Sequence, residues 1–158
     1  MTHSHEQFMQ RAIELSVENV TSKNGGPFGA VIVHKEKIIA EGSNQVTSQN
    51  DPTAHAEITA IREACQKLNK FHLDDCILYT SCEPCPMCLS AIYWAHIPTI
   101  YYAGTKDDVA KIGFDDAWLY DEFKLEASQR KLKMTTLLRD EAQKAYTLWE
   151  SSITKISY

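Results

Sequence analysis

The amino-acid sequence predicts an α/β protein, a three-layer α/β/α sandwich around a mixed sheet of about five strands. Apolar runs of strand length alternate along the chain with amphipathic segments of helix length, the pattern of a sheet covered by helices. A short charged turn joins the first two strands and helices join the later ones, which predicts a hairpin followed by parallel crossovers. The length of 158 residues and the 44% hydrophobic content suit a single domain with one core.

The first helix and the hairpin are expected near the N-terminus. Residues 6–20 carry apolar side chains at helical spacing. Residues 24–27 read Asn-Gly-Gly-Pro, a sequence that interrupts regular structure. The apolar runs 28–33 and 37–41 follow, and we expect them to pair as two antiparallel strands.

Helices and strands alternate through the middle of the chain. A helix is expected over residues 51–69, since Asp or Thr caps a helix and proline suits its first turn. Residues 76–80 form an apolar strand, and the Pro-Cys-Pro sequence at 84–86 opens a helix that ends at about Ala95. The next strand covers residues 99–103.

The C-terminal third shows weaker patterns. Residues 131–138 are expected to form a fifth strand, and residues 139–151 have the apolar spacing of a helix. Residues 152–158 form either a frayed end or a docked tail. The predicted organisation is one domain over residues 1–158, with 152–158 as a C-terminal tail available to cap an active site.

Composition and charge exclude several classes of partner. The net charge is −5 and the pI is about 5.6, the wrong sign for broad attraction to nucleic-acid phosphates. No apolar run approaches membrane-spanning length. The chain start has no signal-peptide character. We therefore expect no nucleic-acid partner, no membrane segment and a cytoplasmic protein.

Five cysteines point to a site rather than to a disulfide framework. Their number is odd, and Cys82, Cys85 and Cys88 follow CxxCxxC spacing, which in a reducing compartment indicates metal binding or redox chemistry. Cys65 and Cys76 lie among apolar residues and are expected in the core.

Two short motifs form a metal-binding constellation. The first is His55-Ala56-Glu57 and the second is Pro-Cys-Pro-Met-Cys at residues 84–88. Together they match H-x-E…P-C-x-x-C, the signature of zinc-dependent nucleobase deaminases. Cys85 and Cys88 are three residues apart and so share one face of a helix. His55 and Glu57 reach one point only from a first helical turn, which predicts two helix N-termini converging on the site.

The donor set indicates one zinc ion per chain. Two thiolates and an imidazole, from His55, Cys85 and Cys88, suit tetrahedral zinc with its fourth position left for water. Positive helix ends favour the thiolates. Glu57 is then the expected catalytic residue, which takes a proton from water and delivers it to the substrate.

Cys82 leaves an alternative open. As a fourth ligand it would close the site and make the protein a non-catalytic structural zinc module. As a small packed residue behind the site it would leave the catalytic interpretation intact.

The chain resembles the cytidine deaminase-like zinc deaminases, and among them the bacterial guanine deaminase branch. The resemblance covers nearly the whole chain. It rests on residues 25–33, on Asn-Asp-Pro-Thr-Ala-His-Ala-Glu at 50–57, on residues 75–88 with Thr-Ser-Cys-Glu-Pro-Cys-Pro-Met-Cys, and on Gly-Phe-Asp-Asp at 113–116. It implies a three-layer fold, one zinc ion, a homodimer, and hydrolysis of guanine to xanthine and ammonia. The motif at 50–57 also occurs in tRNA adenosine deaminases, which is the second activity to consider, although such enzymes need a positive surface.

A purine base as substrate calls for polar and aromatic contacts. Asn44 offers an amide with donor and acceptor character, and Asp116 accepts from N–H groups. Phe28 and Trp94 are expected to sandwich the ring, and Tyr158 to close the pocket if the tail docks, from the same or a neighbouring subunit. The expected substrate-binding residues are Phe28, Asn44, Ala56, Trp94, Asp116 and Tyr158. Simpler roles stay open: a turn for Asn44, core packing for Phe28 and Trp94, and a helix cap or solvated loop for Asp115 and Asp116.

Overall fold

A mixed four-stranded sheet forms the centre of the molecule. The computed structural model describes residues 4–158, which form two compact units that divide after Asp116. In the first unit the strands are β1 (Gly29–His34), β2 (Lys37–Ser43), β3 (Cys76–Cys82) and β4 (Thr99–Gly104). Their order is β2-β1-β3-β4; β1 pairs antiparallel with β2 and β3, and β3 pairs parallel with β4. The predicted hairpin and parallel crossover are confirmed.

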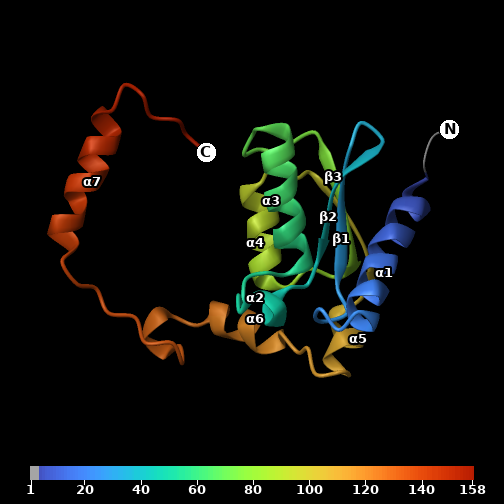
Figure 1. Ribbon diagram of the computed structural model, residues 1–158. Helices are drawn as coiled ribbons and strands as arrows, with labels where there is room; N and C mark the ends of the chain where they lie inside the picture. Colours follow the sequence, from blue (N-terminus) through green and yellow to red (C-terminus); the bar gives the residue numbers. More distant parts are fainter. Residues whose placement is uncertain (1–3) are drawn as a thin grey trace. The chain divides into compact units, whose positions relative to one another are not determined.

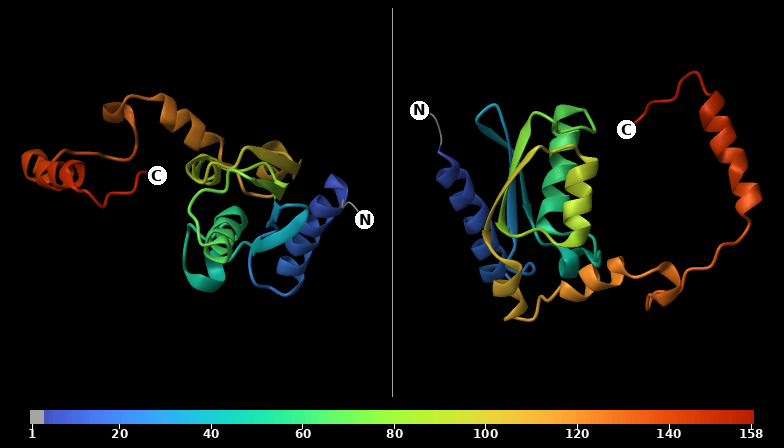
Figure 2. Two further views of the ribbon diagram at one scale, coloured as in Figure 1. Left: turned by 90° about the horizontal axis from the view of Figure 1, so that it is seen from above. Right: turned by 180° about the vertical axis from the view of Figure 1, so that it is seen from behind.

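Helices cover both faces of this sheet. Helix α1 (His5–Thr21) lies on one face, and helices α3 (Ala56–Leu68) and α4 (Pro86–Trp94) lie on the other (Figure 1). Figure 2 shows the same three layers from above. The predicted α/β/α sandwich is confirmed, and within residues 4–158 no helix has the length and apolar character needed to cross a bilayer.

Helix α1 forms where the sequence predicts it. A capping box closes its N-terminus: the Gln7 backbone N–H donates to the Ser4 hydroxyl, and the Ser4 N–H donates to the Gln7 side chain. Its apolar stripe packs on the sheet. The buried cluster on this face contains Phe8, Ala12, Leu15, Val31, Val33 and Tyr79.

Helix α3 packs unusually close to the sheet. Small residues, Ala56, Ala60 and Ala64, form its buried face within the second apolar cluster. A Cβ atom on Gly42 of β2 would overlap the carbonyl oxygen of Ala56 and lie 2.7 Å from the Ala60 nitrogen. This close approach determines where the N-terminus of α3 lies relative to the sheet.

The predicted start of α3 at Asp51 is wrong. The helix begins at Ala56 with His55 as its N-cap residue. Asp51 instead accepts hydrogen bonds from the backbone N–H and the hydroxyl of Thr53, at 2.8 and 2.7 Å. This local turn competes with helix formation, and the preceding Asn50 has a left-handed φ of 51°. The helix therefore starts five residues later, on the metal motif itself.

The predicted fifth strand over residues 131–138 is also wrong. The second unit contains α6 (Ala117–Lys124), a short 3₁₀ turn (Ala127–Gln129) and α7 (Arg139–Ser151), and residues 130–138 form no strand. The Lys131 backbone N–H donates to the Glu122 carboxylate at 2.9 Å, and Leu138 has a left-handed φ of 52°. A strand needs a neighbouring strand to hydrogen-bond, and residues 131–138 pair with no strand of the described chain. The predicted helix over residues 139–151 is confirmed as α7.

Two short helices escaped prediction because each is under two turns long. They are α2 (Val46–Gln49) and α5 (Lys106–Ala110). Both contribute residues to the pocket described below.

Candidate active site and metal centre

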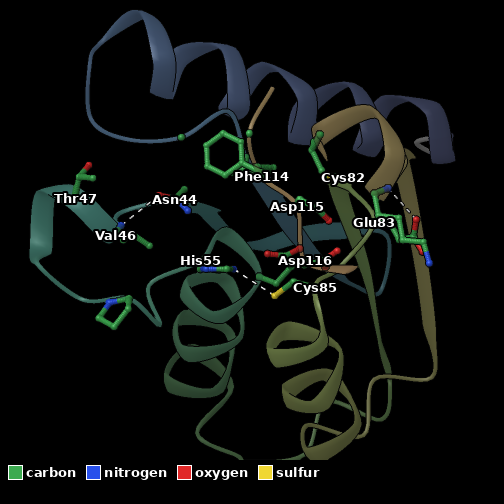
Figure 3. A pocket seen from close by; sticks show the side chains of 17 residues that line it. Asn44, Val46, Thr47, His55, Cys82, Glu83, Cys85, Phe114, Asp115 and Asp116 are labelled. Carbon is green, nitrogen blue, oxygen red and sulfur yellow. Dashed lines mark hydrogen bonds between the residues drawn. The ribbon is translucent and has the colours of Figure 1, made fainter. Parts of the chain in front are cut away.

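The N-termini of α3 and α4 meet at one point. His55 and Cys85 are the two N-cap residues, each with extended backbone, and Cys88 lies in the first turn of α4. The Nδ1 atom of His55 is 3.5 Å from the sulfur of Cys85 (Figure 3). It is also 3.5 Å from the sulfur of Cys88. Proline at the start of α4 suits this position because its missing N–H would have no helical partner.

These three side chains fit a tetrahedral zinc ion. Their ligand atoms all lie within 4.8 Å of one another. A zinc ion with ordinary Zn–N and Zn–S bonds separates a nitrogen from a sulfur by about 3.5 Å, which agrees with the measured distances. Among residues 4–158, no histidine, cysteine or acidic side chain joins this group as a fourth member.

Cys82 therefore lies outside the metal cluster. It ends β3, is 6% exposed, and its thiol points to the carbonyl of Thr105 at 3.9 Å. Burial raises its pKa to about 12, so the group stays a neutral thiol. This geometry does not support the closed structural site.

The electrostatics of the cluster favour a cation. A hydrogen bond from Cys88 and a further one from His55 lower the pKa of Cys85 to about 4, whereas the same pairing with Cys85 raises the pKa of Cys88. The hydrogen bond to Cys85 also raises the pKa of His55. A zinc ion held by these residues would keep the coordinating thiols deprotonated.

Glu57 lies directly behind the cluster. Its side chain is buried, 6% exposed, at the second residue of α3. One carboxylate oxygen accepts a hydrogen bond from the hydroxyl of Thr80 at 3.1 Å, and the other lies 3.4 Å from the Cys88 sulfur. Burial raises the pKa of Glu57 above its ordinary value of 4.5. Burial thus favours the protonated form of this carboxyl more than water does.

A pocket of about 460 Å³ opens above the cluster. This volume lies in the range of small-molecule sites. Its walls come from the loop before β1, the loop after β2, α2 and α5. The end of β3, the starts of α3 and α4, and residues 113–116 complete the lining. The lining residues used below are Phe28, Asn44, Glu57, Glu83, Phe114 and Asp116.

Two predicted polar contacts line this pocket. Asn44 is 7% exposed, and its side-chain oxygen accepts the N–H of Val46 at 3.3 Å. Asn44 thus has the local turn role and also lines the pocket. Asp116 lies near Cys85, and burial raises its pKa. In Figure 3 Asn44 lies above His55, and Asp116 lies to its right, beside Cys85.

The aromatic wall differs from the predicted sandwich. Phe28 lines the pocket and contacts Phe114 edge to face, with ring centroids 5.0 Å apart. Trp94 is the last residue of α4, is 66% exposed, and is not among the pocket-lining residues. Phe114 belongs to the Gly-Phe-Asp-Asp motif at 113–116, of which the sequence predicted only Asp116 as a substrate-binding residue.

Ala56 and Tyr158 are not brought to the pocket within the first unit. Ala56 is fully buried against β2. Tyr158 belongs to the second unit and is 75% exposed. Their proposed substrate contacts stay predictions.

Glu83 was missed by the sequence reasoning although it stands between two motif residues. Its carboxylate accepts the backbone N–H of Lys106 at 3.0 Å, and both residues line the pocket. This bond ties the end of β3 to the start of α5, so Glu83 helps to shape the pocket rim.

Comparisons with known proteins agree with this geometry. The family described as cytidine and deoxycytidylate deaminase zinc-binding region matches residues 2–104, which include every member of the metal cluster and Glu57. The chain is 50% identical to guanine deaminase of Bacillus subtilis over 155 residues, which cover 98% of this chain and 99% of that protein. The X-ray structure of the Bacillus subtilis protein superposes with a TM-score of 0.96 over 99% of both chains.

Two more distant relatives carry different names. A guanine deaminase structure from Nitrosomonas europaea is 34% identical, with a TM-score of 0.67 over 88% of this chain and 80% of that one. A tRNA-specific adenosine deaminase of Buchnera aphidicola is 41% identical over 103 residues, which cover 65% of this chain and 68% of that protein.

Proposed function

Because this chain belongs to the cytidine and deoxycytidylate deaminase zinc-binding family, we propose that it is a zinc-dependent guanine deaminase. The reaction is guanine plus water giving xanthine plus ammonia. One observation carries the hydrolytic chemistry: a buried carboxylate, Glu57, lies beside a three-donor zinc site that lines a pocket. The relatives that match along the whole chain support guanine as the substrate.

His55, Cys85 and Cys88 hold the zinc ion in this proposal. Three protein ligands leave a fourth position open to the pocket, as in catalytic zinc sites. Zinc, when bound there, lowers the pKa of water to about 7 and so supplies a nucleophile at neutral pH.

Glu57 carries the protons. The carboxylate oxygen near Cys88 is within reach of the metal site, whereas the other is held by Thr80. Glu57 takes a proton as water adds to C2 of the base and passes it to the neighbouring ring nitrogen. The second proton goes to the amino group, which leaves as ammonia.

The pocket walls orient the base. The amide nitrogen of Asn44 donates to an acceptor of guanine, and Asp116 accepts from its N–H groups. The ring of Phe28 covers one face of the purine, and Phe114 braces Phe28 at its edge.

A tRNA adenosine deaminase is less well supported. The tRNA deaminase of Buchnera aphidicola matches 65% of this chain, whereas the guanine deaminase of Bacillus subtilis matches 98%. The net charge of −5 also opposes binding of an RNA backbone.

We further propose a cytoplasmic homodimer. All five cysteines are free thiols, the state that a reducing compartment maintains. Several apolar side chains of the second unit are more than 60% exposed, among them Leu132, Leu137, Leu148 and Ile153. Exposed apolar surface of this kind is typical of an interface between subunits.

Three measurements on purified protein test the proposed function. We expect about one zinc per chain, ammonia release from guanine, and no deamination of adenosine in tRNA. Activity on tRNA without activity on guanine would overturn the substrate assignment. Cys82→Ala keeps its zinc in this proposal while Cys88→Ala loses it, and loss of zinc from Cys82→Ala would restore the closed structural site.

A further inference from the structure

A hydroxyl group lies in the apolar layer between the sheet and α3. Thr80 is 1% exposed in the middle of β3, paired with Ala30 of β1. Because side chains alternate along a strand, Thr80 faces the same way as Leu78, which belongs to the apolar cluster beneath α3. An aliphatic side chain would suit this position, because its neighbours are apolar. A buried hydroxyl is costly unless it is hydrogen-bonded, so its partner indicates its role.

That partner is Glu57. The Thr80 hydroxyl donates to Oε1 of Glu57 at 3.1 Å, and Glu57 is the one hydrogen-bond partner of this hydroxyl among residues 4–158. The other carboxylate oxygen, Oε2, lies 3.4 Å from the sulfur of Cys88. The two oxygens of Glu57 therefore have different partners, one on the sheet and one at the metal site.

The contact joins two separate elements. Helix α3 places the Cα of Glu57, but a glutamate side chain has several rotatable bonds beyond it. Thr80 comes from the central strand β3, and its β-branched side chain has few rotamers. A proton carrier is effective only when its oxygen stays within hydrogen-bond reach of the reacting atoms. Thr80 itself is not among the pocket-lining residues, so it acts through Glu57.

We propose that Thr80 is a positioning residue for the deamination: its hydroxyl holds Oε1 of Glu57, so that Oε2 is the oxygen presented to the metal site for proton transfer. This inference rests on the proposed function. It adds to the metal ligands and Glu57 a residue outside the two metal motifs at 55–57 and 84–88.

Two substitutions at this position separate positioning from packing. Thr80→Val keeps the branched shape and removes the hydroxyl, so the fold is retained and the carboxylate is released. We expect kcat on guanine to fall about tenfold, KM to stay within about twofold, and Tm to change by no more than about 3 °C. Thr80→Ser keeps the hydroxyl and deletes a buried methyl group. We expect a lower Tm but a kcat within about twofold of the wild type.

The measurements are steady-state kinetics, zinc content and thermal unfolding of the zinc-loaded full chain. Ser16→Ala serves as a matched control, because Ser16 is a buried hydroxyl on α1 that donates to the Ile13 carbonyl. Its kcat should be unchanged. The Thr80→Val crystal structure should show the Glu57 carboxylate displaced from its wild-type position.

The outcomes distinguish this inference from the function on which it rests. A zinc-loaded wild type that does not deaminate guanine would overturn both. If the wild type deaminates guanine and Thr80→Val has the same kcat, the positioning role alone is overturned. Loss of kcat in Thr80→Ser equal to that in Thr80→Val would also overturn it, since the effect would then follow packing rather than the hydroxyl.

Discussion

At the scale of single residues, the site depends on a few side chains with sharply different surroundings. Cys85 is held as a thiolate at a helix N-terminus, with its pKa lowered to about 4 by hydrogen bonds from Cys88 and His55. Cys82, three residues earlier, has its pKa raised to about 12 by burial. Identical thiols thus serve as ligand and as packing residue. Spacing alone left both roles open for Cys82, and the direction of its side chain decides between them.

Replacing the proposed proton carrier tests the chemistry at this scale. Glu57→Gln keeps the size of the side chain and still accepts from Thr80, but it exchanges no proton. We expect the zinc content and Tm to remain near wild type and kcat on guanine to fall by about 10²- to 10⁴-fold. Steady-state kinetics and metal analysis check this.

The control is Glu63→Gln on the same helix. Glu63 lies outside the metal cluster and the pocket lining and accepts the backbone N–H of Glu41 at 3.1 Å. The Glu63→Gln variant should retain the kcat of the wild type. Near-full activity of Glu57→Gln would remove Glu57 from the mechanism.

At the scale of elements, the positions of the N-termini of α3 and α4 determine the site. The chain reaches α3 through a turn closed by Asp51 and Thr53, so that the helix starts beside His55 rather than before it. Proline opens α4 beside Cys85. Both N-termini then contribute ligands, and the packing of α3 on β2 sets their separation.

Substituting Gly42, which contacts α3, should disturb the metal site although Gly42 is not part of it. In Gly42→Ala the new methyl group meets backbone atoms of Ala56 and Ala60, which cannot move separately from the helix. We expect the free energy of unfolding to fall by about 1–3 kcal/mol, with weaker zinc binding because α3 carries His55. Chemical denaturation and zinc titration measure both effects.

Gly104→Ala is the matched control. Its Cβ would meet the carbonyl oxygen of Ser81 at 3.4 Å, an ordinary contact. Zinc affinity of Gly42→Ala equal to the wild type would show that the α3–β2 contact does not control the site.

An ion pair links α1 to β2 and predicts a pH dependence. Arg11 donates to both oxygens of Glu41, at 2.8 and 2.9 Å, and this hydrogen bonding lowers the pKa of Glu41 below 4.5. The pair therefore stabilises the fold above the unfolded pKa, and this contribution is lost as the pH falls through the lowered pKa. With both side chains partly exposed, we expect Arg11→Met to cost no more than about 1 kcal/mol at neutral pH.

Urea denaturation at a series of pH values provides the measurement. The difference between wild type and Arg11→Met should shrink as the pH falls. Arg62→Met is the control, since Arg62 is 58% exposed and 3.7 Å from its partner Asp51, and it should have little effect at any pH. A difference that grows on acidification would contradict the pairing.

At the scale of the whole molecule, the two units differ in character. The first carries the sheet, the pocket and the metal cluster. The second carries helices with no buried residue and several exposed apolar side chains. Such a segment gains stability only by burying that surface. This is the physical basis of the proposed dimer, which light scattering on the purified protein would test.

Removing residues 152–158 tests the proposed role of the tail. Ile153, Ile156 and Tyr158 are between 64% and 100% exposed, and we expect Tyr158 to cover the bound base. The KM of the truncated chain for guanine should rise about tenfold, because one modest apolar contact with the base is lost. Tyr158→Phe retains the ring and should stay near wild type. Unaltered KM and kcat in the truncated chain would make these residues a simple terminus.

The amino-acid sequence by itself determined the fold class, most elements and the metal ligands. Periodicity and turn residues are local signals, and the motif around His55 and that around Cys85 have fixed spacings. Tertiary structure decided what depends on distant segments meeting. Within residues 4–158 the sheet has four strands and no fifth, and Phe114 packs against Phe28 at the pocket wall. The tertiary structure also brought Thr80 to Glu57, 23 residues apart in the chain, because a strand and a helix pack face to face.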